Sequence, residues 1–555
     1  MDLKIREFPF LPRPFEIADE PILICSTFCY TVRELTMLVL INELTDMPDW
    51  DRKIFDPDFT FEWKSAKVAF GKDVTRSMAD WCVEEVKYYV RNFISTRFIP
   101  ALDGGVLKSD DCVDASLRRD LQRAAAALRR DSTNSTSYSS HMILDIVDPY
   151  LYPFIFAQTK TLRDGTLTSN DCIPRYGEGE AVKRPSDEDC VQKGRPKYPN
   201  DHAWSNRFQW LPFDVQFEDR GETASRIASY INNVHPYTHR SLYHITENLI
   251  DSFLPLFNYT LIDLKASGWQ NQRMHLAVLG RDPMIQREPD PFRPPEQRAL
   301  DWLDRQGRYR DVIFVDLKKE FWNVGVQMVL QLQDINLTPE EPGYEGEPWH
   351  VQGQNNERIC ATAHYVYSTN NLSSSAPPTM SFRRRINPEE AGLARGYVFS
   401  PPYAPEIYGA EDGDAAIQHI GDVKLREGRT VVHPNIFQTR LNKFTLADAS
   451  KPGHCRLLTL HLLDPNRRNM STAMVPCQRR DWWAREIRQR SPRMRRLPTE
   501  VFDNIIGMVD GDPTSTEEAE KIRREFREER EEYRKQHTKS MEAYLGWDLR
   551  GFDDE

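Results

Sequence analysis

Apolar residues in the first half of the chain recur mainly at the spacing of amphipathic α-helices. Residues 31–44 combine helix-forming residues with a wide apolar face, and the Pro-containing stretch at 45–48 ends this segment. The same spacing predicts further helices at 74–97, 113–130, 224–233 and 239–254. Residues 160–206 are rich in Gly, Pro and charge and follow no period, so we expect an irregular insertion there. The region 1–300 is therefore predicted to be mainly helical.

After about residue 300 the helical period gives way to alternation. Residues 327–336 alternate in the manner of a half-buried strand, and residues 359–368 are rich in β-branched and aromatic side chains. Further strands are predicted at 398–400, 429–432 and 456–463. Turns of Gly, Pro, Asn and Asp between them are typical of a β-sandwich or barrel. The sequence therefore predicts an α+β protein with a β-rich, barrel-like core at 301–480.

The last segment, 481–555, has a different charge pattern. Residues 484–496 are strongly basic, whereas residues 517–535 carry many opposite charges at i,i+4 spacing. This spacing predicts a charged helix that lies on the surface in solvent. Because the acids of this tail nearly cancel its bases, we expect no nucleic-acid contact through it.

Composition supports a folded protein and excludes several classes. Hydrophobic residues make up 39% and charged residues 28%, which is enough apolar material for a core. The formal charge of −11 argues against a nucleic-acid partner. No run of about 18 apolar residues occurs, and acids and prolines interrupt the N-terminus, so we expect a cytoplasmic protein with no membrane partner. Nine cysteines, an odd number, disfavour a disulfide framework.

Common catalytic motifs are absent. The sequence has no G-x-x-x-x-G-K-[ST] phosphate loop and no G-x-G-x-x-G after a strand. It also lacks a G-x-S-x-G elbow and an H-E-x-x-H helix. These absences disfavour nucleotide-driven chemistry, nicotinamide binding, serine hydrolysis and zincin-type proteolysis.

Several blocks of sequence resemble one family. They include PWHVQGQNNERICATAHYVYSTN at 348–370, HPNIFQTRL at 433–441, LADASKPGHCRLLTLHLLDPNRR at 446–468 and DPYLYPF at 148–154. Together these blocks resemble the fungal domain-of-unknown-function family four-two-four-six. The resemblance covers nearly the whole chain in the family's order, apart from the charged tail.

The resemblance implies a particular site. The family's pattern has W-H-x-E-G in the first block and P-N-x-x-Q-H-R in the second. A His-x-Glu with a distant His is the sequence form of a facial triad, which holds iron(II) and leaves positions open for oxygen and a 2-oxoacid such as 2-oxoglutarate. The Arg of P-G-H-R could pair with that oxoacid. A double-stranded β-helix-like (jelly-roll) core would bring these residues together in one barrel mouth.

This chain departs from the pattern at three positions. His350 matches the first ligand, but Gln352 stands in place of the Glu. Thr439 occupies the position of the distal His, and Cys455 that of the Arg. The neighbouring Arg456 would point to the opposite face of a strand. Two of three ligands and the oxoacid anchor are thus replaced.

Other residues could rebuild a site. His433 could join His350 as a metal ligand, with Glu357 or Asp422 bringing a carboxylate, and iron halogenases show that a halide can replace the carboxylate where both histidines remain. Two arginines, Arg456 and Arg383, could bind an anionic cofactor or ligand. Without metal, the acid–base candidates are His350, Glu357 and His461. The alternative for each is structural: a strand-end His350, a packed His364, and a solvated turn around Arg383.

Two functions remain open. The first is a divergent oxygenase-like enzyme, an oxidoreductase with a degenerate metal site, acting on a small molecule in fungal specialised metabolism. The second is a pseudoenzyme that binds a ligand or a partner protein, because loss of ligands at two positions is what relaxed catalytic demand would produce. The substrate and the oligomeric state are not indicated by the sequence.

Overall fold

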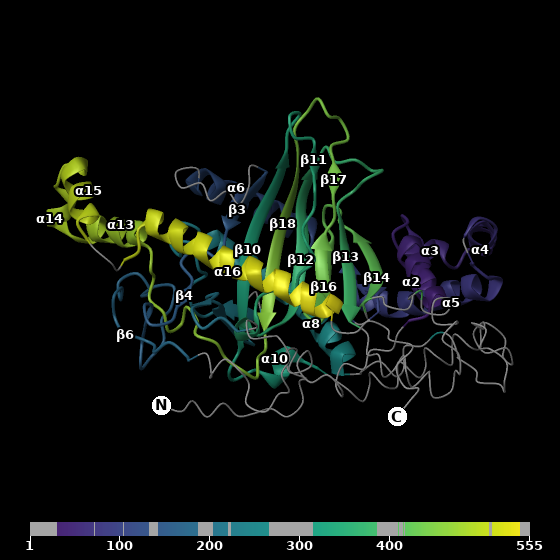
Figure 1. Cartoon of the computed structure of the whole chain (residues 1–555), viewed down its shortest axis with the longest axis horizontal. Helices are drawn as coiled ribbons and strands as arrows, with labels where there is room; N and C mark the ends of the chain where they lie inside the picture. The colour runs from purple at the N-terminus through teal and green to yellow at the C-terminus, as the bar shows by residue number, and fades with distance from the viewer. Residues whose placement is uncertain are drawn as a thin grey trace.

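The largest element is a nine-stranded antiparallel sheet (Figure 1). Its strands, in spatial order, are β1 (Ile99–Leu102), β2 (Val106–Ser109), β15 (Thr430–Pro434), β12 (Ile359–Asn370), β18 (Gly453–Leu463), β10 (Val326–Leu337), β8 (Phe213–Phe217) and β9 (Ser225–Ile227), with β3 (Ile143–Val147) also paired to β10. The structure, a computed structural model, describes residues 30–71, 73–103, 105–132, 142–186, 204–219, 224–265, 273, 315–385, 409, 415, 417–509 and 513–543. All statements below concern these residues.

The sheet combines strands from both halves of the chain. The long strands β10, β12 and β18 and the shorter β15 confirm the strands predicted after residue 300. Five strands, β1, β2, β3, β8 and β9, come from the region predicted to be mainly helical. Residues 225–227 form β9, so the predicted helix at 224–233 is wrong. These strands have only three to five residues, too few for a visible period. The strand predicted at 398–400 lies outside the described residues.

Smaller sheets lie over one face of the large sheet, which we call the inner face. They are a three-stranded sheet of β14 (Ile417–Lys424), β13 (Thr379–Arg385) and β16 (Gln438–Leu441), and a pair of β11 (Gly343–Tyr344) and β17 (Phe444–Thr445). Phe382 and Phe437 from the small-sheet side pack with Val366 and Leu457 of the large sheet. The fold is therefore mixed α/β with packed antiparallel sheets. The described strands do not close into a barrel, which corrects the barrel form of the prediction.

Two helices, α6 (Ala115–Ser132) and α8 (Arg240–Lys265), cover the outer face of the large sheet (Figure 1). They confirm the helices predicted at 113–130 and 239–254. Phe253 of α8 packs with Tyr365 and Leu460, whose side chains alternate to this face.

A helical layer precedes the first strand. It contains α2 (Val32–Leu44), α3 (Trp50–Lys53), α4 (Pro57–Phe70) and α5 (Arg76–Thr96), of which α2 and α5 confirm predictions. Thr31 and Glu34 form a capping box that starts α2. Met37 and Met78 are fully buried in the core of this layer.

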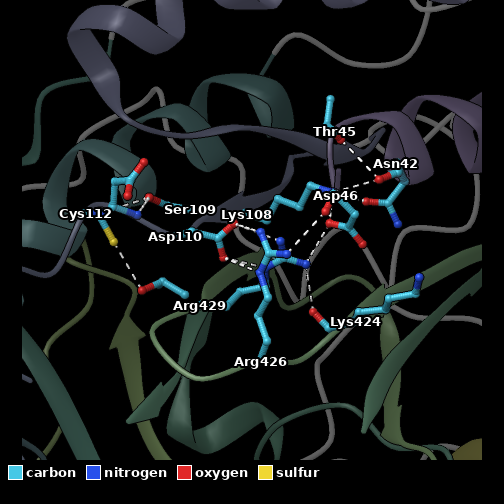
Figure 2. A network of polar contacts seen from close by, with 12 residues as sticks. Asn42, Thr45, Asp46, Lys108, Ser109, Asp110, Cys112, Lys424, Arg426 and Arg429 are labelled. Carbon is cyan, nitrogen blue, oxygen red and sulfur yellow. Dashed lines mark hydrogen bonds and ion pairs between the residues drawn. The ribbon is translucent and has the colours of Figure 1, made fainter. Parts of the chain in front are cut away.

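A buried charge network joins this layer to the large sheet (Figure 2). Lys108 Nζ lies 2.6 Å from Asp46, and Arg429 lies 2.8 Å from Asp46 and 2.7 Å from Asp110. The Arg429 side chain is completely buried, and Lys108 also donates to the backbone and side chain of Asn42. Each buried cation therefore has an acidic partner, and its N–H groups have hydrogen-bond acceptors.

The remaining elements are short or belong to the tail. They are β4 (Phe154–Ile155), β5 (Lys160–Thr161), β6 (Glu180–Ala181), β7 (Phe208–Gln209), α10 (Leu317–Glu320), η1 (Asn355–Glu357), α13 (Arg480–Arg490), α14 (Pro492–Arg495), α15 (Thr499–Gly507) and α16 (Thr516–Ala543). Helices α13–α15 lie at one end of the molecule, and α16 runs from there across β10, β18 and β12 (Figure 1). Within the described part of the chain, no helix has the length and apolar character needed to cross a membrane.

Candidate functional site

Histidine and threonine side chains gather on the inner face of the large sheet. One row runs across β15, β12 and β18 and contains His433, Thr362 and His461, which are direct cross-strand partners. The next row pairs His364 of β12 with Thr459 of β18. Because side chains alternate along a strand, the register of three strands brings these five residues to one face.

Three of these residues form a continuous chain of hydrogen bonds. His433 Nδ1 lies 3.0 Å from the carbonyl of Pro434, which can only accept, so Nδ1 carries the hydrogen and Nε2 accepts. His364 Nε2 then donates to His433 Nε2 over 3.2 Å, and Thr459 donates to His364 Nδ1 over 3.1 Å. This arrangement satisfies both imidazoles in their neutral forms.

The third histidine of the sheet, His461, is only half satisfied. Its Nδ1 lies 3.0 Å from the hydroxyl of Thr362. Its Nε2 has no hydrogen-bond partner among the described residues, although the side chain is completely buried. The ring packs against Trp210, with 5.3 Å between centroids.

His350 completes the group from a segment outside the long strands. It forms an isolated β-bridge with Thr439, with backbone hydrogen bonds of 3.1 and 2.8 Å. Its Nδ1 donates to the carbonyl of Pro348 over 3.0 Å, and the amide of Gln352 donates to its Nε2 over 3.1 Å. The positions that resemble the family's first, second and distal ligands are therefore adjacent in space.

Burial keeps the four histidines, His350, His364, His433 and His461, neutral. It lowers the pKa of His350 and of His461 to about 3 and that of His433 to about 4. The pKa of His364 falls well below its usual value, mainly through burial and then through the nearby His433. Near neutral pH these imidazoles are therefore uncharged, and they take part in the site as neutral hydrogen-bonding groups. We call these four residues the histidine cluster.

Helix α16 covers this end of the inner face. Ala519 and Phe526 are fully buried, and Phe526 stacks on Phe208 with 4.7 Å between ring centroids. The helix predicted to lie in solvent is thus buried along one side. The arginines on this side are Arg523, Arg527, Arg530 and Arg534, at successive three- or four-residue intervals.

These arginines meet buried acids from distant parts of the chain. Arg523 Nε lies 2.6 Å from Asp148, and Arg527 lies 2.8 Å from Asp145 and 2.9 Å from Asp148. Both aspartates have completely buried side chains. The guanidinium groups therefore provide the counter-charges that these carboxylates need in a dry environment.

Glu357 is held in a similar way. Both of its oxygens accept from Arg530, whose Nη1 lies 2.7 Å from Oε2, and the backbone N–H groups of Gln354 and Trp210 also donate to the carboxylate. Only 1% of Glu357 is exposed. These contacts occupy the carboxylate, which leaves it poorly suited to the acid–base role predicted from the sequence.

The other candidates lie away from the histidine cluster. Arg456 points to the opposite face of β18 and lies 3.4 Å from Asp334. Cys455 is fully buried in the apolar core between the sheets. Arg383 stacks over Trp349 at 4.6 Å and pairs with Glu542 of α16 at 3.1 Å.

Asp422 accepts from Ser381 and lines a half-open pocket of about 740 Å³ between α2 and the three-stranded sheet. None of the four residues of the histidine cluster lines this pocket. Asp422 is thus not placed as a carboxylate partner for His350 or His433.

Sequence reasoning missed the contribution of Trp210 and of the arginines of α16. Trp210 stands in the segment FQWLPFDV at 208–215, where an aromatic residue alone signals a core position. The arginines stand in a pattern that also fits a solvated helix. Only their spacing at 523, 527, 530 and 534 could have indicated a single buried side.

The residues do not fit the iron site that the resemblance implies. Among the described residues, no three His, Cys, Asp or Glu side chains are placed to hold a metal ion together. The rings of His364 and His433 are nearly parallel and meet through their Nε2 atoms, so the lone pair of His433 Nε2 accepts from His364 and is not directed to a shared metal position. At His350 the coordinating nitrogen accepts from Gln352, which supplies no negative charge.

Fold and site together define a mixed α/β protein with a buried, neutral histidine cluster between packed sheets. The chain belongs to the family described as "Protein of unknown function (DUF4246)", which matches residues 76–486. Residues 8–66 match the domain described as "Domain of unknown function DUF4246, N-terminal". This membership confirms the resemblance found in the sequence blocks. Helix α16 lies beyond the matched residues.

Solved structures give weak likenesses. The chain is similar to a selenomethionine-labelled Fe(II)/(alpha)ketoglutarate-dependent dioxygenase, TqaL, at 15% identity and a TM-score of 0.18, covering 31% of this chain and 54% of that one. It is also similar to IDO from Bacillus thuringiensis at 10% identity and a TM-score of 0.16, covering 31% and 59%. The chain thus spans little more than half of each, and such scores define neither fold nor function. A search of curated proteins finds no match.

Proposed function

We propose that this chain is a ligand-binding relative of oxygenase-like proteins, in which a jelly-roll type of pocket is kept and the iron-dependent step is lost. The observation that carries the proposal is the group formed by His350, Gln352 and Thr439. The three positions lie side by side, as a facial triad would require, but two of them carry uncharged residues. In addition, the amide of Gln352 occupies the lone pair that His350 would offer to a metal.

The energetic argument favours loss of the metal rather than a shift of ligands. A divalent iron needs anionic or neutral lone pairs that converge on one point. Here each imidazole nitrogen that could bind is either hydrogen-bonded to a neighbour or, for His461, isolated from a second ligand. A metal would have to break the His364–His433 and His350–Gln352 contacts first.

The direct test is metal binding by the full chain and by a variant with the triad rebuilt. We expect purified wild-type protein to bind no iron(II) under anaerobic titration and to show no oxygen uptake with 2-oxoglutarate. The double variant Gln352→Glu, Thr439→His should gain iron(II) affinity, because it restores the carboxylate and the distal imidazole at adjacent backbone positions.

A matched control is the double variant Gln216→Glu, Thr439→His, which adds the same groups but places the carboxylate at an exposed position of β8, away from His350. Stoichiometric iron(II) binding by the wild type, with oxygen uptake that depends on 2-oxoglutarate, would overturn the proposal. So would equal iron affinity of the rebuilt and control variants.

A second candidate is a metal-free enzyme that acts on a small molecule, with an isomerisation, cyclisation or hydrolysis in a fungal specialised pathway. The observation that favours it is the unpartnered Nε2 of His461, which is a hydrogen-bond acceptor for a substrate group when Nδ1 holds the hydrogen toward Thr362. Deletion of the gene, followed by metabolite profiling, tests it. A compound that accumulates in the deletion strain and is consumed again after complementation by wild type, but not by His461→Gln, would support this candidate over the non-catalytic one.

A further inference from the structure

The half-open pocket of about 740 Å³ between α2 and the three-stranded sheet lies away from the histidine cluster. Helix α2 contacts β14, the edge strand of that sheet (Figure 1). The lining comes from one side of α2, from β14, β13 and β16, and from the segment 345–347. Sites for small molecules in proteins have volumes of about 300 to 1,000 Å³. The pocket therefore has the size of a ligand site, and its lining indicates the kind of ligand.

Helix α2 forms an apolar wall of this pocket. Val32, Leu35 and Val39 recur at helical spacing on the side of α2 that lines it. The exposed fraction is 36% for Val32 and 45% for Val39. Residues on the other side of the helix, such as Met37 and Leu38, are buried in the core. An apolar ligand group that covers the exposed side would be stabilised by removal of this surface from water.

A row of polar side chains crosses the three strands beside this wall. Asp422, Ser381 and Arg440 are direct cross-strand partners on β14, β13 and β16. Arg440 Nε donates to the side chain of Asn442 over 3.0 Å. Asn442 in turn donates to Ser381 over 2.6 Å, and the Ser381 hydroxyl donates to Asp422. The row therefore ends in a guanidinium on β16 and a carboxylate on β14, and neighbouring side chains hold both ends in place.

The two charged ends of the polar row do not neutralise each other. In the part of the chain that the structure describes, the guanidinium of Arg440 contacts Asn442 and the ring of Trp349, 4.4 Å away. The carboxylate of Asp422 contacts Ser381 there. Neither end has an ion-pair partner among these described residues. Two strand spacings, about 10 Å, separate the two backbone positions, so one small ligand can reach both charges.

The charges of the whole pocket nearly balance. Its titratable residues are Arg440, Lys443, Asp422, Glu345, Glu347 and His419. Burial raises the pKa of Glu347 and lowers that of His419, which favours the neutral form of each. Two cations and two carboxylates remain, so the pocket suits a ligand without net charge. A ligand with one charge of each sign can pair with both ends of the polar row.

We propose that this pocket binds a small zwitterion that carries an apolar group. Its carboxylate pairs with Arg440 and its ammonium group with Asp422. Its apolar group packs against Val32 and Val39. Free amino acids with apolar side chains and short peptides both have this chemistry. Because side chains alternate along β16, Arg440 points away from the face of Thr439. The inference therefore goes beyond the proposed function and does not depend on the fate of the metal site.

The experiment is calorimetric titration of the full chain with leucine and with leucyl-leucine. Three further titrations use compounds that each lack one group of leucine. Isocaproate lacks the ammonium group, leucinamide lacks the carboxylate, and glycine lacks the apolar side chain. We expect each of the three to bind at least tenfold more weakly than leucine. Tighter binding of leucyl-leucine than of leucine would assign the pocket to peptides, and the reverse order would assign it to free amino acids.

Variants test the assigned contacts. Arg440→Gln and Asp422→Asn should each weaken leucine binding at least tenfold, because each removes one charged end of the polar row. Val39→Ser should weaken it several-fold by removing apolar surface from the wall. The matched control is Lys424→Gln, which removes a charge at an exposed position of β14 that does not line the pocket. It should leave leucine binding unchanged.

Three outcomes would overturn the inference. They are absence of binding by both leucine and leucyl-leucine, binding of any of the three truncated compounds as tight as that of leucine, and equal effects of Arg440→Gln and Lys424→Gln. The titrations of the truncated compounds use the wild-type chain, so a variant that fails to fold cannot hide a negative result. Iron(II) enters none of these measurements, so failure of this inference is distinguishable from failure of the proposed function.

Discussion

Two buried polar regions of the molecule differ in how completely their groups are satisfied. In the network of Figure 2, Lys108 and Arg429 meet Asp46 and Asp110, and every donor of these cations is used or paired. Under α16, by contrast, donors of Trp210 and Arg530 lack partners. A structural role is enough to account for the first region, because its charges are all matched. The donors under α16 are thus less completely matched than those of the first region.

The first region also shows how burial and counter-charges oppose each other. Burial lowers the pKa of Lys108 to about 7, although Asp46 acts in the opposite direction. The pKa of Asp46 is lowered by Lys108 and Arg429 despite its own burial. Asp46 is therefore held in its charged form by the two cations, whereas burial nearly cancels the help that Asp46 gives to the charged form of Lys108. Removing Arg429 takes away the one cation that both acids share.

The largest expected effect comes from Arg429→Met. This change leaves Asp46 with Lys108 alone and Asp110 with only the half-exposed Arg426, and we expect a loss of about 4 kcal/mol in the free energy of unfolding. Urea denaturation measures it. The control is Arg426→Met, which also contacts Asp110 but has a side chain that is 48% exposed. This control should lower the free energy of unfolding by less than about 1 kcal/mol. Equal losses for the two variants would show that the buried Arg429 stabilises the fold no more than the exposed Arg426.

A smaller effect is expected from Arg530→Met, which leaves Glu357 buried and charged. Two backbone N–H groups still contact the carboxylate, so we expect a loss of about 3 kcal/mol. Adding Glu357→Gln to the same chain should restore most of it, because the uncompensated charge is gone. A double-mutant cycle from urea denaturation gives the coupling. A double variant as unstable as the sum of the single ones would show that the two residues act independently.

Acidification tests the neutral state of the histidine cluster. Its folded pKa values are about 3 to 4 for three members, below the ordinary value of about 6.5 in the unfolded chain. The unfolded chain therefore takes up protons first, and stability that is complete above pH 6.5 is lost as pH falls. Between pH 6.5 and 5 each such histidine contributes up to about 1.4 kcal/mol per pH unit.

The variant His461→Gln should make this loss of stability less steep, by up to one proton in the slope of unfolding free energy against pH. The control is His244→Gln on α8, whose side chain is 64% exposed. The same slope for His461→Gln and wild type would contradict the burial of a neutral imidazole.

The smallest expected effect on stability is that of Arg534→Gln. The Arg534 side chain is partly exposed and its ion pair with Glu531 spans 3.9 Å, so its loss should change the free energy of unfolding by less than about 1 kcal/mol. Thermal denaturation measures it. A large destabilisation would mean that this arginine belongs to a structural network like the one around Arg429.

The sequence allowed the long elements to be predicted, and with them part of the site. Strands β10, β12 and β18 show clear alternation, and the motif blocks contain His350 and Thr439, which lie beside each other in the structure. The contact between His364 and His433 could not be predicted, because it depends on the register of β12 with β15 across 69 positions. The cover over the site could not be predicted either, since an arginine that points to solvent and one that points to a buried carboxylate have the same sequence pattern.

Helix α16 has a consequence for where this protein can be cut. The family match ends at residue 486, and a fragment designed from that boundary would omit every arginine that α16 supplies. Asp145, Asp148 and Glu357 would then lose those cations, and the aromatic surface around Phe208 would face water. The end of the family match is therefore not the end of the folding unit. A fragment that ends there would need those acids replaced by neutral residues.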